Sequence, residues 1–221
     1  TSGSSTQCTA IGYKSMGGAL AGYANTAVGD HTMAVAAGAF GNTCMGRSAL
    51  VALTTGSNNT AIGNYAGDAL TTGSNNTSLG YQADSTAVGA SNEFTLGNSS
   101  VSALRCADTS IAALSDRRDK KDIIDSSYGL EFINKIRPVQ FTWDRRNLVE
   151  GDLESVHNGK TRIGFISQEL QEAMEGDSNE ILDLVYEENP ERLEVKQGKL
   201  VPILVKAIQE LSAKVKELEN K

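Results

Sequence analysis

The segment Leu53-Thr-Thr-Gly-Ser-Asn-Asn-Thr-Ala-Ile-Gly63 decides the fold, because it returns 17 residues later as Leu70-Thr-Thr-Gly-Ser-Asn-Asn-Thr-Ser-Leu-Gly80. The same register continues on both sides of this pair. An aliphatic residue recurs at a spacing of 17, and an asparagine stands two residues before the middle of the triplet in four copies. The aliphatic column is Ile11, Val28, Met45, Ile62, Leu79 and Leu96, the asparagine column is Asn25, Asn42, Asn59 and Asn76, and a weaker column of small residues is Gly22, Ala39, Gly56, Gly73 and Ala90.

A short repeat with one β-type triplet, a glycine and an Asn/Gly turn is typical of one coil of a β-solenoid. We therefore predict an all-β solenoid shaft over residues 1–100. The coils stack, so the aliphatic column becomes a continuous ladder, and alanine fills many of the other inward positions. One aliphatic residue per coil is a thin core for a single chain. This small apolar core predicts that other copies of the chain pack against the coils, most simply three around an axis. A flexible Gly/Ser-rich linker is the alternative, but a linker does not hold a fixed register.

The units T-A-[IV]-G and N-N-T-A-I-G resemble the head repeats of trimeric autotransporter adhesins and related segments of phage tail fibres. The resemblance covers about residues 6–98. It implies a trimeric β-roll.

Composition divides the chain into two unlike parts. Residues 1–100 hold 16 of the 22 glycines and six charged side chains, whereas the rest of the chain holds the other 41 charges. The net charge of −7 argues against a nucleic-acid partner, because phosphate binding needs a basic face. No apolar run is long enough to span a membrane. The chain begins at Thr1 without a methionine or a signal peptide, so we expect it to be a fragment of something longer.

Cysteine and histidine are too few and too scattered to form a metal-ligand cluster. The chain has Cys8, Cys44 and Cys106, with His31 and His157 as its histidines. We predict reduced thiols, no metal and no cofactor.

Ser115-Asp-Arg-Arg-Asp-Lys120 lies where the uncharged repeat gives way to a charged sequence. A lysine can take the proton of a serine hydroxyl when burial or a cationic neighbour lowers the pKa of its amine. Arg117, Arg118 and Lys121 flank Lys120 in this way. The spacing alone is weak evidence for a catalytic pair, because most serines five residues from a lysine are simply solvated.

The regions around this pair have their own patterns. Residues 101–114 alternate loosely and predict an extended β connector. Residues 115–221 predict an α+β domain, with a helix over 129–136 that Pro138 stops, a strand over 139–143, and a long loop or arm over 144–160. A strand over 162–166 then enters a helix capped by Ser167, with Leu170 and Met174 facing the core. Residues 182–186 and 193–196 predict a hairpin around Asn189-Pro190.

The tail has the clearest helical pattern. Apolar residues alternate spacings of three and four along a heptad seam, which predicts a trimeric coiled-coil helix; a helix packed on its own domain is the alternative. The seam is Val201, Leu204, Ile208, Leu211, Val215 and Leu218.

Four ordered motifs, S-D-x-R-x-K-x-D-I, G-L-x-F-I-N-K-I-R-P-V-x-F-x-W, G-F-I-S-Q-E-L and L-V-P-I-L-V-K-A-I-Q-E-L, resemble the intramolecular chaperone auto-processing domain. That domain ends many phage tail fibres and tailspikes, including endosialidases. The match runs from Ser115 to about Glu219. The resemblance implies a homotrimeric domain that guides folding of the preceding fibre and then cuts itself off.

Carried over by position, Ser115 is the nucleophile and Lys120 the base, and the bond between Leu114 and Ser115 is cut. Asp116 and Arg118 match the motif as supporting residues that hold the loop or pair across subunits. The doubled Lys120-Lys121 leaves open which lysine acts, although spacing favours Lys120.

We therefore predict the C-terminal region of a phage tail fibre or tailspike, a virion protein assembled in the host cytoplasm, with a bacterial surface glycan or receptor as a candidate partner of the fibre. Three rivals remain open. One is an uncleaved, trimeric receptor-binding tip, another is a glycan-degrading enzyme with its centre upstream of Thr1, and the third is a bacterial surface adhesin.

Overall fold

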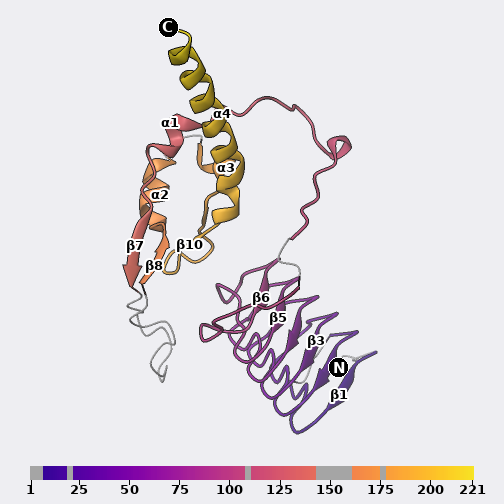
Figure 1. Ribbon diagram of the computed structural model, residues 1–221. Helices are drawn as coiled ribbons and strands as arrows, with labels where there is room; N and C mark the ends of the chain where they lie inside the picture. The colour runs from indigo at the N-terminus through magenta and orange to yellow at the C-terminus, as the bar shows by residue number, and fades with distance from the viewer. Residues whose placement is uncertain (1–6, 19–21, 108–110, 143–160, 175–177) are drawn as a thin grey trace. The chain divides into compact units, whose positions relative to one another are not determined.

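The computed structural model describes residues 7–18, 22–107, 111–142, 161–174 and 178–221. The chain forms two compact units, Thr1–Ala103 and Leu104–Lys221. The first unit is a parallel β-solenoid, as the 17-residue register predicts (Figure 1). Six three-residue strands stack in sequence order into one sheet: β1 (Thr9–Ile11), β2 (Thr26–Val28), β3 (Thr43–Met45), β4 (Thr60–Ile62), β5 (Thr77–Leu79) and β6 (Phe94–Leu96).

Each strand pairs with the next at a shift of 17 residues, so Thr60 lies opposite Thr77 and Ile62 opposite Leu79. The glycine after each strand has a positive φ, +143° at Gly63, where a residue with a side chain is strained. A Cβ atom placed on Gly63 would lie 2.3 Å from the carbonyl oxygen of Gly80. The coils therefore stack this closely only with glycine at the bend.

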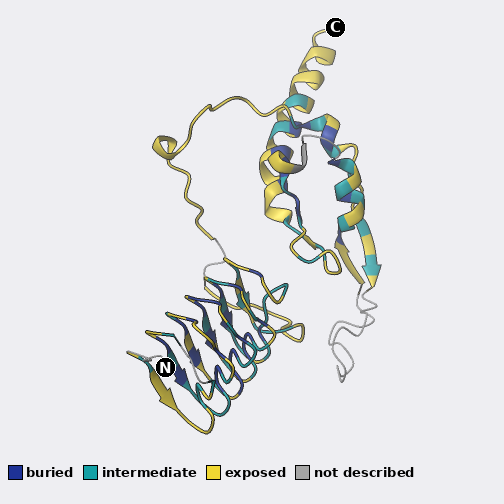
Figure 2. Ribbon diagram, turned by 180° about the vertical axis from the view of Figure 1, so that it is seen from behind, coloured by how far each residue is buried: buried dark blue, intermediate teal, exposed yellow. Residues whose placement is uncertain are grey.

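The aliphatic ladder forms, but the expectation that it belongs to the interior of the coils is wrong. Strand side chains alternate, and the middle residue of the triplet points inward, so Ala27, Cys44 and Ala61 are fully buried. Ile11, Met45, Ile62 and Leu96 are 43 to 59% exposed. The large buried side chains come from the turns instead, as Met33, Leu50, Leu53 and Leu70. Figure 2 shows this alternation of buried and exposed residues along the coils.

The asparagine column is a buried ladder rather than a set of exposed turns. The Asn59 side chain receives hydrogen bonds at Oδ1 from the backbone N and the Nδ2 of Asn76, both at 3.0 Å. Its own Nδ2 donates to Asn42 Oδ1 at 3.1 Å and to the Gly73 carbonyl at 2.9 Å. Asn58, next to it, is exposed with φ +58° and makes the turn. Of these two adjacent asparagines, Asn59 therefore makes the buried hydrogen bonds and Asn58 makes the turn.

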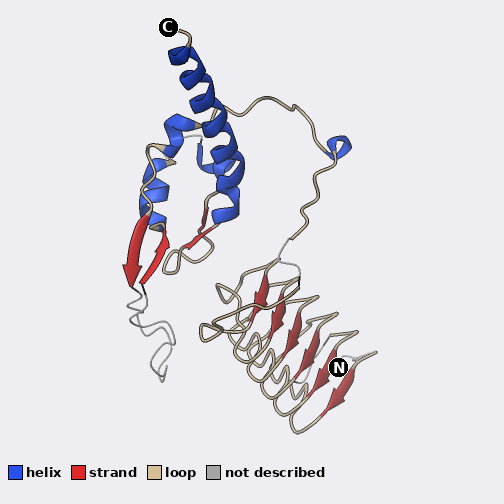
Figure 3. Ribbon diagram, in the orientation of Figure 1, coloured by secondary structure: helices blue, strands red, loops and turns tan. Residues whose placement is uncertain are grey.

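The second unit contains an α+β region and a long C-terminal helix, as predicted (Figure 3). Antiparallel strands β7 (Val139–Thr142) and β8 (Thr161–Gly164) pair, as do β9 (Val185–Tyr186) and β10 (Glu194–Val195), which is the predicted hairpin. The helices are η1 (Arg117–Asp119), α1 (Leu130–Ile133), α2 (Ser167–Ala173), α3 (Ser178–Leu182), η2 (Gln197–Lys199) and α4 (Leu200–Glu219). Residue 143 and the predicted arm 144–160 lie outside the described residues.

The core of this unit forms around Phe132, Leu170, Met174, Leu184 and Ile203, all buried. The predicted inward positions of Leu170 and Met174 are thus confirmed. Helix α3 was not predicted from the sequence.

Two local predictions in this unit are wrong. The helix expected over 129–136 is the single turn α1, which ends well before Pro138. It is held by burial of Phe132 and by Glu210, whose Oε2 accepts a hydrogen bond from the Leu130 backbone N at 2.9 Å. Ser167 is the first residue of α2 and not its cap. Ile166 takes the capping position in an extended conformation, and no side chain caps the helix there.

The extended β connector over 101–114 stays a prediction. The described residues in 101–107 and 111–114 are exposed and contain no strand. A strand requires a hydrogen-bonded neighbour, and the single chain offers none along this stretch. The division at residues 100 and 114 stays a prediction.

Candidate functional site: the serine–lysine turn

A single 3-10 turn places the candidate site residues. Asp116 precedes η1 with an extended backbone, and its Oδ1 accepts a hydrogen bond from the Arg118 backbone N at 2.8 Å. The Lys120 backbone N closes the turn by donating to the Arg117 carbonyl at 3.2 Å. The turn therefore reverses the chain between Ser115 and Lys120. Aspartate is well suited to cap such a turn, because its carboxylate oxygens accept hydrogen bonds from backbone N–H groups of the turn.

Ser115 and Lys120 are in direct contact within one chain. Lys120 Nζ donates to Ser115 Oγ at 2.6 Å. Lys121 points elsewhere, and its Nζ lies 3.8 Å from Asp122 Oδ2. The residue that sequence spacing favours is therefore the lysine that reaches the hydroxyl. Catalysis by this pair stays a prediction.

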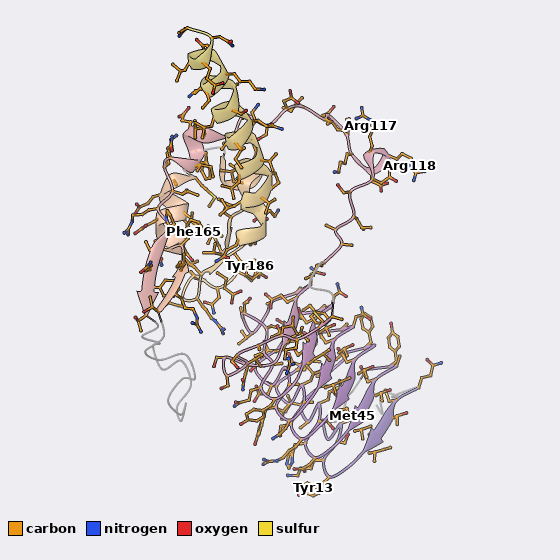
Figure 4. All side chains as sticks on the ribbon, in the orientation of Figure 1. Tyr13, Met45, Arg117, Arg118, Phe165 and Tyr186 are labelled. Atoms are coloured by element: carbon orange, nitrogen blue, oxygen red, sulfur yellow. The ribbon has the colours of Figure 1, made fainter. Side chains whose placement is uncertain are left out.

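Asp116 and Arg118 form a bidentate ion pair across the same turn. Arg118 Nη2 donates to Asp116 Oδ2 at 2.6 Å, and Nε donates to Oδ1 at 3.1 Å. These hydrogen bonds lower the pKa of the Asp116 carboxyl and raise the pKa of the Arg118 guanidinium. Of the two roles considered from the sequence, the contact within one chain fits holding the loop. Figure 4 shows Arg117 and Arg118 projecting from this turn.

The turn is fully solvated in the single chain. Residues 111–126 are all exposed, and the Leu114 side chain, on the acyl side of the predicted cleavage point, has no cover at all. Lys120 Nζ is the donor in its contact with Ser115 Oγ. A proton can move from the hydroxyl to the amine only after the amine becomes neutral, and burial favours the neutral form.

The predicted coiled-coil seam is also exposed. Helix α4 packs on its own unit through Leu200, Ile203 and Ala207, which are buried. The seam lies on other faces of the helix, and its six residues are 43 to 69% exposed. The helix therefore contacts its own domain without using the seam. Figure 2 shows the C-terminal end of α4 exposed all round.

No group of three or more His, Cys, Asp or Glu side chains in the described part of the chain is arranged to hold a metal ion. Among the helices of that part, none combines the length and the apolar character that crossing a membrane requires.

Comparison with known families agrees with this geometry. Residues 115–177 match the family model described as chaperone of endosialidase. The match begins at the serine of the candidate pair and includes η1, α1, the β7–β8 pair and α2. This match supports an intramolecular chaperone domain in the C-terminal part of the chain. Searches of curated proteins and of solved structures gave no significant match.

Proposed function

We propose that this chain is the C-terminal region of a bacteriophage tail fibre or tailspike, and that its chaperone domain releases itself by autoproteolysis between Leu114 and Ser115. The observation that carries this proposal is the 2.6 Å contact between Lys120 Nζ and Ser115 Oγ at the first residues of the chaperone match. The preceding β-solenoid fits the fibre that such a domain folds. In this proposal the protein belongs to the virion and assembles in the host cytoplasm.

The proposed reaction has two steps, transfer of the Leu114 acyl group to Ser115 Oγ and hydrolysis of the resulting ester. The Ser115 Oγ adds to the Leu114 carbonyl carbon while its proton passes to neutral Lys120, and Lys120 then delivers that proton to the departing Ser115 nitrogen. Leu114 is left as an ester on Ser115 Oγ. Water hydrolyses this ester, which frees the Leu114 carboxylate and leaves Ser115 as a new amino terminus. Asp116 and Arg118 hold the turn and take no part in bond breaking.

Three chains provide the desolvation that one chain lacks. Two apolar faces are left open in the single chain, the aliphatic ladder of the solenoid and the seam of α4. Contiguous exposed apolar surface marks an interaction site, and both faces run along the length of their elements. We propose that a homotrimer covers both faces and buries the Ser115–Lys120 turn. Cleavage then follows assembly.

Intact mass and N-terminal sequencing of the purified protein test this proposal. Wild type is expected to yield a fragment that starts at Ser115, and Ser115→Ala is expected to stay whole. Lys120→Ala should stay whole as well, while Lys121→Ala, which removes the neighbouring cation, should still cleave. Cleavage in Lys120→Ala together with its loss in Lys121→Ala would reassign the base.

The alternative is a permanent trimer clamp at a receptor-binding fibre tip or on a surface adhesin. Its supporting observation is the full exposure of the turn in the single chain. A wild-type chain that is intact and trimeric by light scattering would favour the clamp. A chain that is intact and monomeric would count against both versions of the fibre. In either version a bacterial surface glycan or receptor is the proposed partner of the solenoid.

A further inference from the structure

The Lys, Arg and His residues of positions 1–100 stand at equivalent places in successive coils of the solenoid. Lys14 and Arg47 are the only Lys or Arg residues in positions 1–100, and His31 is the only histidine there. All three stand at the first or second residue after the bend glycine of successive coils. We call this group the basic corner, and its members are Tyr13, Lys14, Asp30, His31, Arg47 and Tyr65.

The members of the basic corner contact one another across the coils. Asp30 accepts a hydrogen bond from His31 Nδ1 at 2.7 Å, and its other oxygen lies 3.6 Å from Arg47 Nε. The rings of Tyr13 and His31 meet edge to face, with centroids 5.3 Å apart. The Arg47 guanidinium lies 5.3 Å from the centre of the Tyr65 ring. The corner is therefore ordered in advance of any ligand, since its side chains fix one another.

The fold itself does not require these residue types. The second position after the bend glycine has the same left-handed backbone in five coils, at Lys14, His31, Ser48, Tyr65 and Gln82, with φ between 49° and 56°. Ser48 and Gln82 fill that position without a charge or a ring. The position before it holds Asn64 in the fourth coil where the third has Arg47. Uncharged residues can therefore form the same turn. The turn does not explain why charged and aromatic residues occupy it in the first three coils.

The corner remains open to solvent. Tyr13 is 67% exposed and lies at the outer edge of the first coil (Figure 4). Arg47 and Asp30 are 60% and 41% exposed at their side chains. Lys14 lies over the Tyr13 ring at 5.3 Å and makes no ion pair with any residue that the structure describes. Within the described residues, Lys14 is therefore a cation of the corner with no counter-charge.

We propose that the basic corner is a binding site for a saccharide chain that carries carboxylate groups. Hydroxyl groups both donate and accept hydrogen bonds, and the corner offers donors in Arg47 and Lys14 beside an acceptor in Asp30. The exposed ring of Tyr13 offers apolar surface that suits the apolar face of a sugar ring. Lys14 supplies the charge that an acidic sugar unit needs. Adjacent coils are about 4.8 Å apart, so the corner spans about 15 Å from Tyr13 to Tyr65, a stretch that a short oligosaccharide can cover.

This inference gives a site and a ligand class to the surface-glycan partner proposed above, and it does not depend on autoproteolysis. An acidic peptide fits the corner less well, because it brings few hydroxyl groups to the donors and the acceptor that the corner offers. A second copy of the chain is the other occupant to test.

Binding to immobilised polygalacturonate, alginate and hyaluronate, each beside neutral dextran, tests the proposal. Wild type is expected to be retained on at least one carboxylated chain and to pass dextran freely. The double variant Lys14→Gln/Arg47→Asn should weaken that retention by about tenfold or more. Both replacements copy residues that the same turn already holds in later coils, at Gln82 and Asn64, so the solenoid should remain folded.

Arg105→Gln is the matched control, because it removes one exposed positive charge outside the solenoid unit and on the same side of the predicted cleavage point. It should leave retention unchanged. Absence of retention on all three acidic chains would overturn the proposal, as would an equal loss in Arg105→Gln. Loss of the trimer in the double variant would instead make the corner a subunit contact. Mass and oligomeric state, measured on the same samples, separate a failure here from a failure of the fibre proposal.

Discussion

At the scale of single residues, the buried asparagine ladder replaces much of the apolar core that the repeat lacks. Asn59 is 1% exposed and makes four side-chain hydrogen bonds, to Asn42, Asn76 and Gly73. Replacing it with alanine removes the partner of the buried Asn76 backbone N and of the Gly73 carbonyl, and each such loss costs about 1–3 kcal/mol. We expect Asn59→Ala to lower the free energy of unfolding by about 3 kcal/mol or more. Denaturant unfolding followed by circular dichroism measures this.

Asn58→Gly is the control for that experiment. The exposed Asn58 has φ +58°, a conformation that glycine adopts freely and that Gly41 adopts at the same point of an earlier coil. We expect a change within about 0.5 kcal/mol. Equal effects from the two variants would contradict a structural role for the buried ladder.

We expect a carboxyl pair in the later coils, Asp68 and Asp84, to make the stability of the solenoid depend on pH. Burial, with a further contribution from Asp68, raises the pKa of Asp84 to about 7. The unfolded chain has a carboxyl pKa of about 3.9, so the folded state binds more protons between these values. The contribution of Asp84 to stability is therefore greatest below about pH 4, falls as the pH rises to about 7, and stays low above that.

Asp84→Asn removes this penalty and keeps the oxygen that faces the Ala69 backbone N. We expect the variant to unfold at a higher denaturant concentration than wild type at pH 8. The gain should be on the order of 1 to 2 kcal/mol, since the site is partly solvated, and should shrink toward pH 5. Asp68→Asn removes only the repulsion and should give a smaller gain. A gain that is independent of pH would rule out this explanation.

At the scale of elements, α4 packs on its own domain with one face and leaves its seam exposed. Ile203 is buried in the domain core, whereas Ile208 on the seam is 66% exposed. We expect Ile208→Glu to weaken the trimer while the monomer stays folded, because a charge in an apolar interface must be desolvated. Gln209→Glu adds the same charge one residue away, at an exposed position off the seam, and should leave the trimer intact. Sedimentation gives the oligomeric state, and circular dichroism checks the fold.

Ile203→Glu distinguishes the two faces. It should unfold the domain itself, at a cost of several kcal/mol, because it places a charge in the core. A trimer that survives Ile208→Glu would show that the seam is not the contact between chains.

What the sequence could predict follows from how each element is stabilised. The solenoid was predictable because every coil repeats the same backbone conformation, so one register fixes all six strands. Which residues face the interior of the solenoid could not be predicted. Strands of three residues show no clear alternation, and large core residues such as Met33 and Leu50 stand in the turns. The length of helix α1 was overestimated because it depends on contacts with distant parts of the chain. These are the core into which Phe132 packs and the carboxylate of Glu210. The Ser115–Lys120 contact was foreseen because it is local and needs only a turn of five residues.

At the scale of the whole molecule, the chaperone domain should make folding of the fibre a one-way process. In the proposed homotrimer, three chains with sparse cores must find a common register, and a terminal trimeric domain would raise their local concentration before the solenoid forms. Once the link at Leu114 is cut, a denatured solenoid lacks that aid. Its persistence then depends on the rate of unfolding rather than on the equilibrium.

Refolding of wild type and of Ser115→Ala from denaturant tests this directly. The variant should keep the domain attached and recover solenoid structure and trimer on dilution, with recovery that rises with chain concentration. Separated wild-type solenoid should recover several-fold less, although its unfolding rate in denaturant is no faster than that of the variant. Adding back the free chaperone domain should not restore the yield, since the link supplies the effective concentration. Equal recovery of the two proteins would mean that the solenoid assembles unaided, and the chaperone domain would then have another purpose in this chain.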